Sequence, residues 1–273
     1  MRNIKYFIFE KLALLQNKDM NKVHLKKEDI KSVLLIRQDN RIGNILFITS
    51  LINLIEEELH IKPDVILGEK FNDILKNNPK INNILIYSQK KFLKNPILFF
   101  KFIKNIKRRH YDLVIDCKNV FSFNNALLTL FSNSQLKIGF KNLYSDKYLD
   151  YAVEVSDSQN LHETEYLALA FKNYFNIDRK VPKMSYYLNE NKENQSYLNE
   201  EKKKIGIHIG GRGSKSLNVD LINNILSEFT EFDIKIIYGP DELEKVKLLK
   251  DSKNVEKVFP NSIDSLASLI NGL

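Results

Sequence analysis

The stretch of residues 31–55, KSVLLIRQDNRIGNILFITSLINLI, determines how the fold begins. Its run VLLI at residues 33–36 is short, continuously apolar and partly β-branched, which is typical of a buried parallel strand. A polar loop over residues 38–43 ends in glycine, and from Asn44 onward the apolar residues recur at helical spacing. The stretch therefore predicts a strand, a glycine loop and a helix, which together open a βαβ unit.

The same alternation continues along the chain. Further strands are predicted at residues 64–67, 83–87, 113–115, 137–139, 205–209, 234–238 and 255–259. Helices are predicted at residues 71–76, 96–109, 124–131, 161–175, 219–229 and 262–270, and another opens at Gly239. Residues 140–158 are rich in loop-forming types. We therefore predict an α/β protein of two Rossmann-like, doubly wound halves.

The pattern divides the chain into four parts. They are an N-terminal amphipathic extension over residues 1–30, an acceptor-side Rossmann-like domain over residues 31–180, a polar linker over residues 181–203 and a partial nucleotide-sugar-binding domain over residues 204–273. The last part has three predicted strands, fewer than an open doubly wound sheet usually contains. We therefore expect the second domain to be incomplete and the chain to be truncated at its C-terminus.

The N-terminal extension begins with a stripe of apolar residues at helical spacing. The stripe consists of Ile4, Phe7, Ile8, Leu12 and Leu15. Such a helix either lies on a membrane surface or packs against the body of the protein, and the second interpretation is favoured.

Composition narrows the class of protein. The chain contains a single cysteine, Cys117, so no intrachain disulfide framework exists, which fits a reducing cytoplasm. No apolar run is long enough to span a bilayer. The net charge of +8 fits nucleic acid, an anionic membrane or an anionic substrate, although the excess lysine also belongs to a bias of the whole sequence. Because no nucleic-acid-binding motif is present, we expect no nucleic-acid partner.

The first candidate site is the loop RQDNRIGN at residues 37–44. Open α/β sheets bind ligands beyond the carboxyl ends of their strands, where this loop lies. Asp39 can act as an acid or base beside a sugar hydroxyl, and Arg41 and Gly43 belong to the same loop. A helix that begins at Asn44 adds a positive dipole and free amides. The alternative is that Asn44 is only a helix cap and Gly43 a turn residue.

The second candidate site is HIGGRGSK at residues 208–215, between a strand and a helix. Gly210 and Gly211 let the backbone approach an anion, Arg212 and Lys215 supply positive charge, and Ser214 can donate a hydrogen bond to phosphate. The spacing fits neither a P-loop nor a dinucleotide fingerprint. The alternative is a flexible turn.

Three further features have a functional and an ordinary interpretation. Glu242, in GPDE at residues 239–242, either accepts from ribose hydroxyls or complements a helix dipole. His162 either reaches an acceptor or caps the following helix. Residues 90–110 combine lysines, arginines and phenylalanines with no acid, so this helix either faces anionic lipid or is an ordinary surface helix.

Taken in order, these segments resemble glycosyltransferase family 9, which includes the ADP-heptose:lipopolysaccharide heptosyltransferases. The matching segments are RQDNRIGN at residues 37–44, YDLVID at 111–116, KIGFK at 137–141, the helix start at 162–169, HIGGRGSK at 208–215 and GPDE at 239–242. The resemblance extends from residue 32 to residue 273, and it depends on the order of the motifs more than on any one of them.

The resemblance implies a GT-B architecture, in which two Rossmann-like domains face each other across a cleft. A lipid-anchored core oligosaccharide would bind the first domain and a nucleotide-sugar, ADP-heptose in the family, the second. Lys215 would contact the donor phosphate, Gly210 and Gly211 would line it, and Glu242 would lie near the nucleotide's sugar. The family transfers heptose with inversion and without a metal ion or a further cofactor. The resemblance also implies that the protein acts at the cytoplasmic face of the inner membrane.

Two departures from the family pattern concern catalysis. The family's general base follows the loop glycine, and here that position holds Asn44, whose amide cannot accept a proton as a carboxylate does. We therefore predict Asp39 as the substitute base. The family's Asp-Ser-Gly-x-x-His donor segment would follow Leu273. Two functions result: an inverting heptosyltransferase-like enzyme, or a truncated homologue that binds glycan or nucleotide without turnover.

Overall fold

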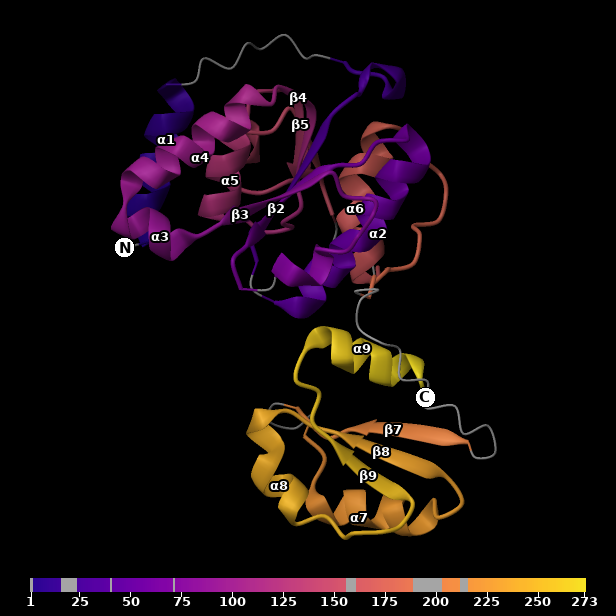
Figure 1. The fold of residues 1–273 in the computed structure, drawn as a ribbon. Coiled ribbons are helices and arrows are strands. Elements are labelled where there is room, and N and C mark those ends of the chain that lie inside the picture. Colours follow the sequence, from indigo (N-terminus) through magenta and orange to yellow (C-terminus); the bar gives the residue numbers. More distant parts are fainter. Residues whose placement is uncertain are drawn as a thin grey trace. The chain divides into compact units, whose positions relative to one another are not determined.

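The computed structural model describes residues 2–15, 24–39, 41–70, 72–155, 161–188, 203–211 and 216–273. The chain forms two compact units, Met1–Tyr187 and Leu188–Leu273 (Figure 1). Within the predicted linker, residues 189–202 lie outside the described part. Two residues of its first part hydrogen-bond to the helix that follows the first strand, since the Lys183 carbonyl accepts from Asn53 Nδ2 at 3.0 Å and the Ser185 N–H donates to Thr49 Oγ1 at 3.0 Å.

The first unit is built on a parallel sheet with the strand order β3-β2-β1-β4-β5-β6. The strands are β1 Val33–Arg37, β2 Asp64–Gly68, β3 Asn83–Tyr87, β4 Tyr111–Asp116, β5 Ser134–Phe140 and β6 Tyr151–Val153. Every residue of β1 is buried, as the apolar run predicts. The order reverses between β1 and β4, so the carboxyl ends of these two strands border the position where open α/β sheets bind ligands. The predicted α/β fold class is confirmed.

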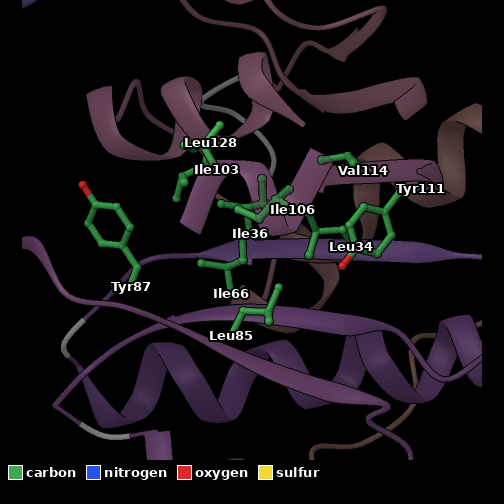
Figure 2. Packing of buried hydrophobic residues seen from close by; sticks show 10 residues of the cluster. All are labelled: Leu34, Ile36, Ile66, Leu85, Tyr87, Ile103, Ile106, Tyr111, Val114 and Leu128. Atoms are coloured by element: carbon green, nitrogen blue, oxygen red, sulfur yellow. The ribbon is translucent and has the colours of Figure 1, made fainter. Parts of the chain in front are cut away.

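Helices cover both faces of this sheet (Figure 1). On one face lie α2 Ile42–Leu59 and α6 Glu163–Tyr174, which pack against each other, and on the other lie α1 Arg2–Leu15, α4 Pro96–Arg108 and α5 Phe123–Phe131. Figure 2 shows the core under α4, where Ile103 and Ile106 meet Leu34 and Ile36 of β1 and Ile66 of β2. Each fully buried isoleucine of this kind contributes about 1.5–3 kcal/mol to stability.

Two local predictions are wrong, and one short helix was not predicted. Residues 71–76 do not form an α-helix, because only the 3-10 turn Asn72–Leu75 is present. The short helix α3 Gln89–Lys94 was not predicted, although Ser88 caps it by accepting from the Lys91 N–H. The strand β6 lies within the stretch predicted as loop, because three residues carry too little periodicity to reveal an edge strand.

The predicted N-terminal helix is present as α1 and packs against the first unit. Phe9 is completely buried against Ala126 and Leu130 of α5 and against Tyr148. Phe9 does not belong to the predicted apolar stripe; of the stripe, Leu12 packs against this cluster, whereas Ile8 is 44% exposed. The opposite side of the helix leaves Phe7 59% exposed.

A buried carboxylate ties the amino ends of β2, β3 and β4 together. Asp64 opens β2 and is 4% exposed. Its Oδ2 accepts from Arg109 Nη1 and from the Tyr111 hydroxyl, each at 2.6 Å, while its Oδ1 accepts from Asn82 Nδ2 at 2.8 Å and Asn83 Nδ2 at 2.9 Å. Burial, reinforced by the bond to Asp64, raises the pKa of Tyr111 above its ordinary value, so this hydroxyl remains a donor. The cluster lies at the edge of the sheet opposite to the loops predicted to bind ligands.

The second unit contains a parallel sheet with the strand order β7-β8-β9 in its described residues. Its elements are β7 Lys204–His208, α7 Val219–Glu228, β8 Asp233–Ile237, the 3-10 turn η5 Pro240–Glu242, α8 Leu243–Lys247, β9 Val255–Val258 and α9 Ile263–Asn271. Figure 1 shows α7 and α8 on one face of this sheet and α9 on the other. The three predicted strands are confirmed, and the loops after β7 and β8 leave the sheet at its carboxyl edge.

Candidate functional site

The carboxylate of Asp39 is held at the carboxyl edge of the first sheet. It lies in the loop between β1 and α2 with its side chain 12% exposed. Its Oδ2 accepts a hydrogen bond from Asn44 Nδ2 at 2.7 Å and lies 3.7 Å from Arg37 Nη2 and 3.9 Å from Lys118 Nζ. The two residues predicted as catalytic, Asp39 and Asn44, are therefore in direct contact, beside two cations.

Asn44 is not a helix cap, so that interpretation is wrong. The helix α2 begins at Ile42, and the capping position is held by the exposed Arg41, whose side chain makes no capping bond. Gly43 and Asn44 therefore belong to the first helical turn, and Gly43 is not a turn residue of the loop. The Asn44 side chain donates to Asp39 and thereby orients its carboxylate. The position where the family resemblance predicts a base is thus occupied by an amide that holds the neighbouring acid.

Gly43 leaves space beside the start of α2. A Cβ atom at this position would come no closer to another residue than 3.9 Å, from Phe47 Cε2. The Phe47 ring in turn meets the His162 ring edge-on, with ring centroids 5.9 Å apart. His162 caps α6, since its Nδ1 accepts from the Thr164 N–H at 3.3 Å. The capping interpretation of His162 is thus correct, and its ring also lies close to the start of α2.

A second acid at this edge, Asp116, was not predicted as a site residue. It ends β4 and is 1% exposed. Its Oδ1 accepts from Asn125 Nδ2 at 2.8 Å and the Lys118 N–H at 3.1 Å, and its Oδ2 from the Tyr148 hydroxyl at 3.1 Å. Gly139 on β5 makes room for it, because a Cβ there would lie 3.3 Å from Asp116 Cβ. The signal in the sequence was an acid that closes an apolar strand.

Asp116 is joined to the Asp39 loop through Lys118. The backbone N–H of Lys118 bonds to Asp116, and its ammonium group approaches Asp39. Burial raises the pKa of Asp116 from 3.8 to about 6, against the opposing effect of its hydrogen bonds. The interior of the first unit therefore contains a carboxyl group that ionises close to neutral pH and braces the loop that carries the candidate base.

We predict that Asp116 makes stability fall as pH rises. Its pKa is higher in the folded than in the unfolded chain, so the folded state binds the proton more tightly and loses stability as the pH rises between about 4 and 6. Compared with Asp116→Asn, the parent should lose about 2–3 kcal/mol of unfolding free energy across this interval and nothing above it. Urea unfolding of both proteins at a series of pH values measures the difference. A difference that is constant, or that grows with pH, contradicts the assignment.

In the second unit, Glu242 connects the loops that follow β7 and β8. Its Oε2 accepts from the Gly239 N–H at 2.9 Å. On the other side, a Cβ at Gly210 would lie 3.2 Å from Glu242 Oε1 and 2.8 Å from His208 Cε1, so a larger residue there would displace the His208 ring. Glu242 therefore caps its own turn, as the ordinary interpretation predicts, and also faces the glycine loop, as the functional one requires.

These groups border a hollow of about 360 Å³ at the carboxyl edge of the second sheet. Its lining consists of His208, Gly210, Gly211, Ser216, Gly239, Asp241, Glu242 and Lys245. Three predicted donor-site residues, Arg212, Ser214 and Lys215, lie outside the described residues. The loop that contains them begins and ends at this hollow. The structure thus brings Gly210, Gly211 and Glu242 together, as predicted.

Lys245 lies in the same hollow and was not predicted. Its Nζ donates to the Leu217 carbonyl at 2.8 Å, to Ser216 Oγ, and at 3.5 Å to the Ile209 carbonyl. One ammonium group therefore binds both flanks of the glycine-rich loop. Its position three residues after Glu242, a spacing that places two side chains on one face of a helix, was the available signal.

Comparison with known proteins agrees with this geometry. Residues 99–216 match the family model of glycosyltransferase family 9 (heptosyltransferase). No curated protein matches the sequence. Among solved structures, the glycosyltransferase family 9 protein from Veillonella parvula is 14% identical with a TM-score of 0.76, over 92% of this chain and 75% of that one.

Two structures from Escherichia coli are also similar. The heptosyltransferase WaaC with ADP is 18% identical with a TM-score of 0.64, over 89% of this chain and 78% of that one. ADP-heptose lps heptosyltransferase II is 16% identical with a TM-score of 0.66, over 89% of this chain and 77% of that one. The two α/β units therefore have an α/β fold of the GT-B type found in these structures. More particularly, residues 99–216 are similar to glycosyltransferase family 9 (heptosyltransferase), and the resemblance predicted from the sequence is confirmed.

Proposed function

We propose that the protein transfers a heptose-like sugar, with inversion, from a nucleotide-diphosphate donor to a lipopolysaccharide core-type acceptor. The observation that carries the proposal is the position of Glu242 across the loops after β7 and β8, at the edge of a hollow lined by Gly210 and Gly211. A nucleotide donor is supported by the E. coli structures, which carry ADP and ADP-2-deoxy-2-fluoro heptose. By the resemblance, ADP-heptose is the proposed donor.

The donor is proposed to bind through its ribose and its diphosphate. Glu242 accepts from a ribose hydroxyl, while the amides of Gly210 and Gly211 approach the phosphates, which no side chain obstructs at these positions. Arg212, Ser214 and Lys215 supply further hydrogen bonds and positive charge to the diphosphate. Lys245 positions this loop by its bonds to the residues at both ends of it.

The acceptor is proposed to react beside Asp39. Its hydroxyl oxygen attacks the anomeric carbon in line as the bond to the diphosphate breaks, and Asp39 takes the hydroxyl proton. Lys215 and the loop amides stabilise the charge that develops on the leaving diphosphate. Asn44 holds the carboxylate by the 2.7 Å hydrogen bond, and Arg41, Gly43 and His162 border the acceptor side. This chemistry uses no metal ion or cofactor other than the donor.

A second function is favoured by one observation. Asn44 occupies the position of the family's base, and its amide nitrogen donates to Asp39, so this position presents no carboxylate. A homologue that has lost this base while keeping the donor hollow would bind a glycan or a nucleotide without turnover. The two candidates share the binding site and differ in proton transfer alone.

The test is turnover by the full chain. ADP-heptose and a heptose-free lipopolysaccharide core are incubated with the parent and with Asn44→Asp, and the release of ADP and the mass of the glycan are measured. Product from the parent supports the transferase. Product from Asn44→Asp alone, with equal nucleotide affinity in both proteins, supports the non-catalytic homologue. If neither protein binds ADP, the transferase and the nucleotide-binding form of the homologue both fail, and if neither binds the core glycan as well, the homologue fails entirely. We propose that the reaction takes place at the cytoplasmic face of the inner membrane, where the acceptor is anchored.

A further inference from the structure

A basic surface with apolar residues at its centre is formed by α3 and α4, and we call it the α3–α4 surface. Its apolar residues are Leu93, Ile97 and Phe100, which are 76%, 64% and 69% exposed. Around them lie exposed cations on both helices, namely Lys90, Lys91, Lys94, Lys101, Lys104 and Arg108. Large apolar side chains this exposed, among so many exposed cations, distinguish the surface from an ordinary solvated helix face.

Helix geometry places these residues together on the outer side of α4. Residues 97, 100, 101, 104 and 108 follow the spacing i, i+3, i+4, i+7 and i+11, which forms one stripe along an α-helix. The opposite stripe contains Ile103 and Ile106, which are buried in the core of the first unit (Figure 2). The core therefore determines which side of α4 faces outward, and that side carries both the lysines and the two exposed apolar residues.

The charge of this surface is not compensated locally. The sequence contains no aspartate or glutamate from residue 74 to residue 111. Among the residues that the structure describes, none of the cations of the α3–α4 surface forms an ion pair. Lysines that repel one another without forming ion pairs destabilise the protein slightly unless an external anion binds there.

We infer that the α3–α4 surface binds an anionic phospholipid bilayer, with Leu93, Ile97 and Phe100 in the boundary between headgroups and acyl chains. The exposed aliphatic side chains favour a lipid bilayer over a nucleic acid as the anionic partner. Leucine and isoleucine cannot stack on bases, whereas an interfacial helix uses apolar residues and lysines in this combination. None of the helices in the described part of the chain is long and apolar enough to cross a membrane.

The inference extends the proposed function, whose acceptor is anchored in a lipid, but it does not require turnover. Membrane binding would hold the first unit, which carries Asp39, on the surface where such an acceptor lies. Binding to lipid vesicles and catalysis can therefore be measured separately, and a negative result for one proposal does not refute the other.

Fluorescence offers a direct test because the chain contains no tryptophan. Phe100→Trp places a single reporter at the centre of the α3–α4 surface, and Leu248→Trp places a matched reporter at a residue of the second unit that is 67% exposed. With vesicles of phosphatidylcholine and phosphatidylglycerol, the emission of Phe100→Trp should shift to the blue and that of Leu248→Trp should not. Equal shifts at both positions, or none at position 100, overturn the inference.

Vesicle sedimentation measures the contribution of charge. Each surface lysine strengthens binding to anionic lipid about fivefold, so Lys101→Gln with Lys104→Gln should weaken partitioning about 25-fold. The control pair, Lys247→Gln with Lys250→Gln in the second unit, should leave it unchanged. High salt should release the parent, and vesicles of phosphatidylcholine alone should bind it weakly.

Turnover separates this inference from the proposed function. On a detergent-solubilised acceptor, Lys101→Gln with Lys104→Gln should work at the parent rate, and on vesicle-embedded acceptor it should work more slowly. Partitioning that is equal for the parent and this variant contradicts the assignment of the surface, as does tighter binding of the parent to DNA than to vesicles. Absence of turnover in every protein, with the vesicle results as expected, refutes the transferase and leaves the membrane surface standing.

Discussion

Asp39→Asn is expected to lower kcat by about 10²–10⁴-fold, the usual contribution of a positioned general base. The substitution keeps the size of the side chain and removes its ability to take the acceptor proton. Nucleotide affinity should remain unchanged, because Asp39 belongs to the first unit and the proposed donor site to the second. Initial rates of ADP release, together with calorimetric titration of ADP, measure the two effects.

A double variant separates the base from a structural role. Asn44 Nδ2 and Asp39 Oδ2 are joined by a 2.7 Å hydrogen bond, so Asp39→Asn with Asn44→Asp exchanges donor and acceptor across the same contact. The carboxylate then stands directly after Gly43, as in the family pattern. We expect the exchange to restore most of the turnover lost in Asp39→Asn. Turnover of Asp39→Asn equal to that of the parent would exclude Asp39 as the base.

The single variant Asn44→Asp has a further consequence. It places two carboxylates at hydrogen-bond distance, and like charges this close cannot both ionise readily, so the pair shares a proton. The pH profile of turnover should then show an added ionisation that neither the parent nor the exchanged double variant shows. The profile thereby reports whether the two side chains remain in contact in the working enzyme.

Asp64→Ala is expected to lower the free energy of unfolding by about 3–5 kcal/mol, because it leaves a guanidinium group and a buried hydroxyl without their carboxylate. Arg109 and Tyr111 both donate to Asp64 Oδ2 at 2.6 Å. The arginine side chain is 30% exposed and recovers some hydration, so the lower part of this range applies. Urea unfolding followed by circular dichroism measures the loss.

A matched variant shows whether charge or hydrogen bonding is responsible. Asn82→Ala removes one neutral donor from the same carboxylate, and about 1 kcal/mol is expected. Neither variant should change the affinity for ADP, because Asp64 lies at the amino edge of the first sheet and the candidate site residues at the carboxyl edges. Equal losses in both variants would show that the ion pair contributes nothing beyond its hydrogen bonds.

The sequence alone predicts the α/β class and the loops that carry the candidate site residues. The apolar run before Arg37 reads as a buried parallel strand, and the change from strand to helical spacing marks the turn that holds Asp39. The same change of period marks the turns after β7 and β8, where Gly210 and Glu242 lie. Periodicity suffices here because a strand buried on both faces and an amphipathic helix each leave a local pattern of apolar residues.

Contacts between distant segments are decided by the tertiary structure alone. The pKa of Asp116 rises to about 6 because the fold buries its carboxyl group, although Asn125 and Tyr148, which donate to it from separate elements, oppose the rise. Lys245 binds both ends of a loop about thirty residues before it in the chain, and no spacing rule reaches that far. The apolar pattern suggests that Asn44 caps α2, but the helix begins two residues earlier. Asn44 therefore lies within the first turn, where its side chain donates to Asp39. Local patterns record the period of an element, whereas burial and charge pairing depend on which elements the fold brings together.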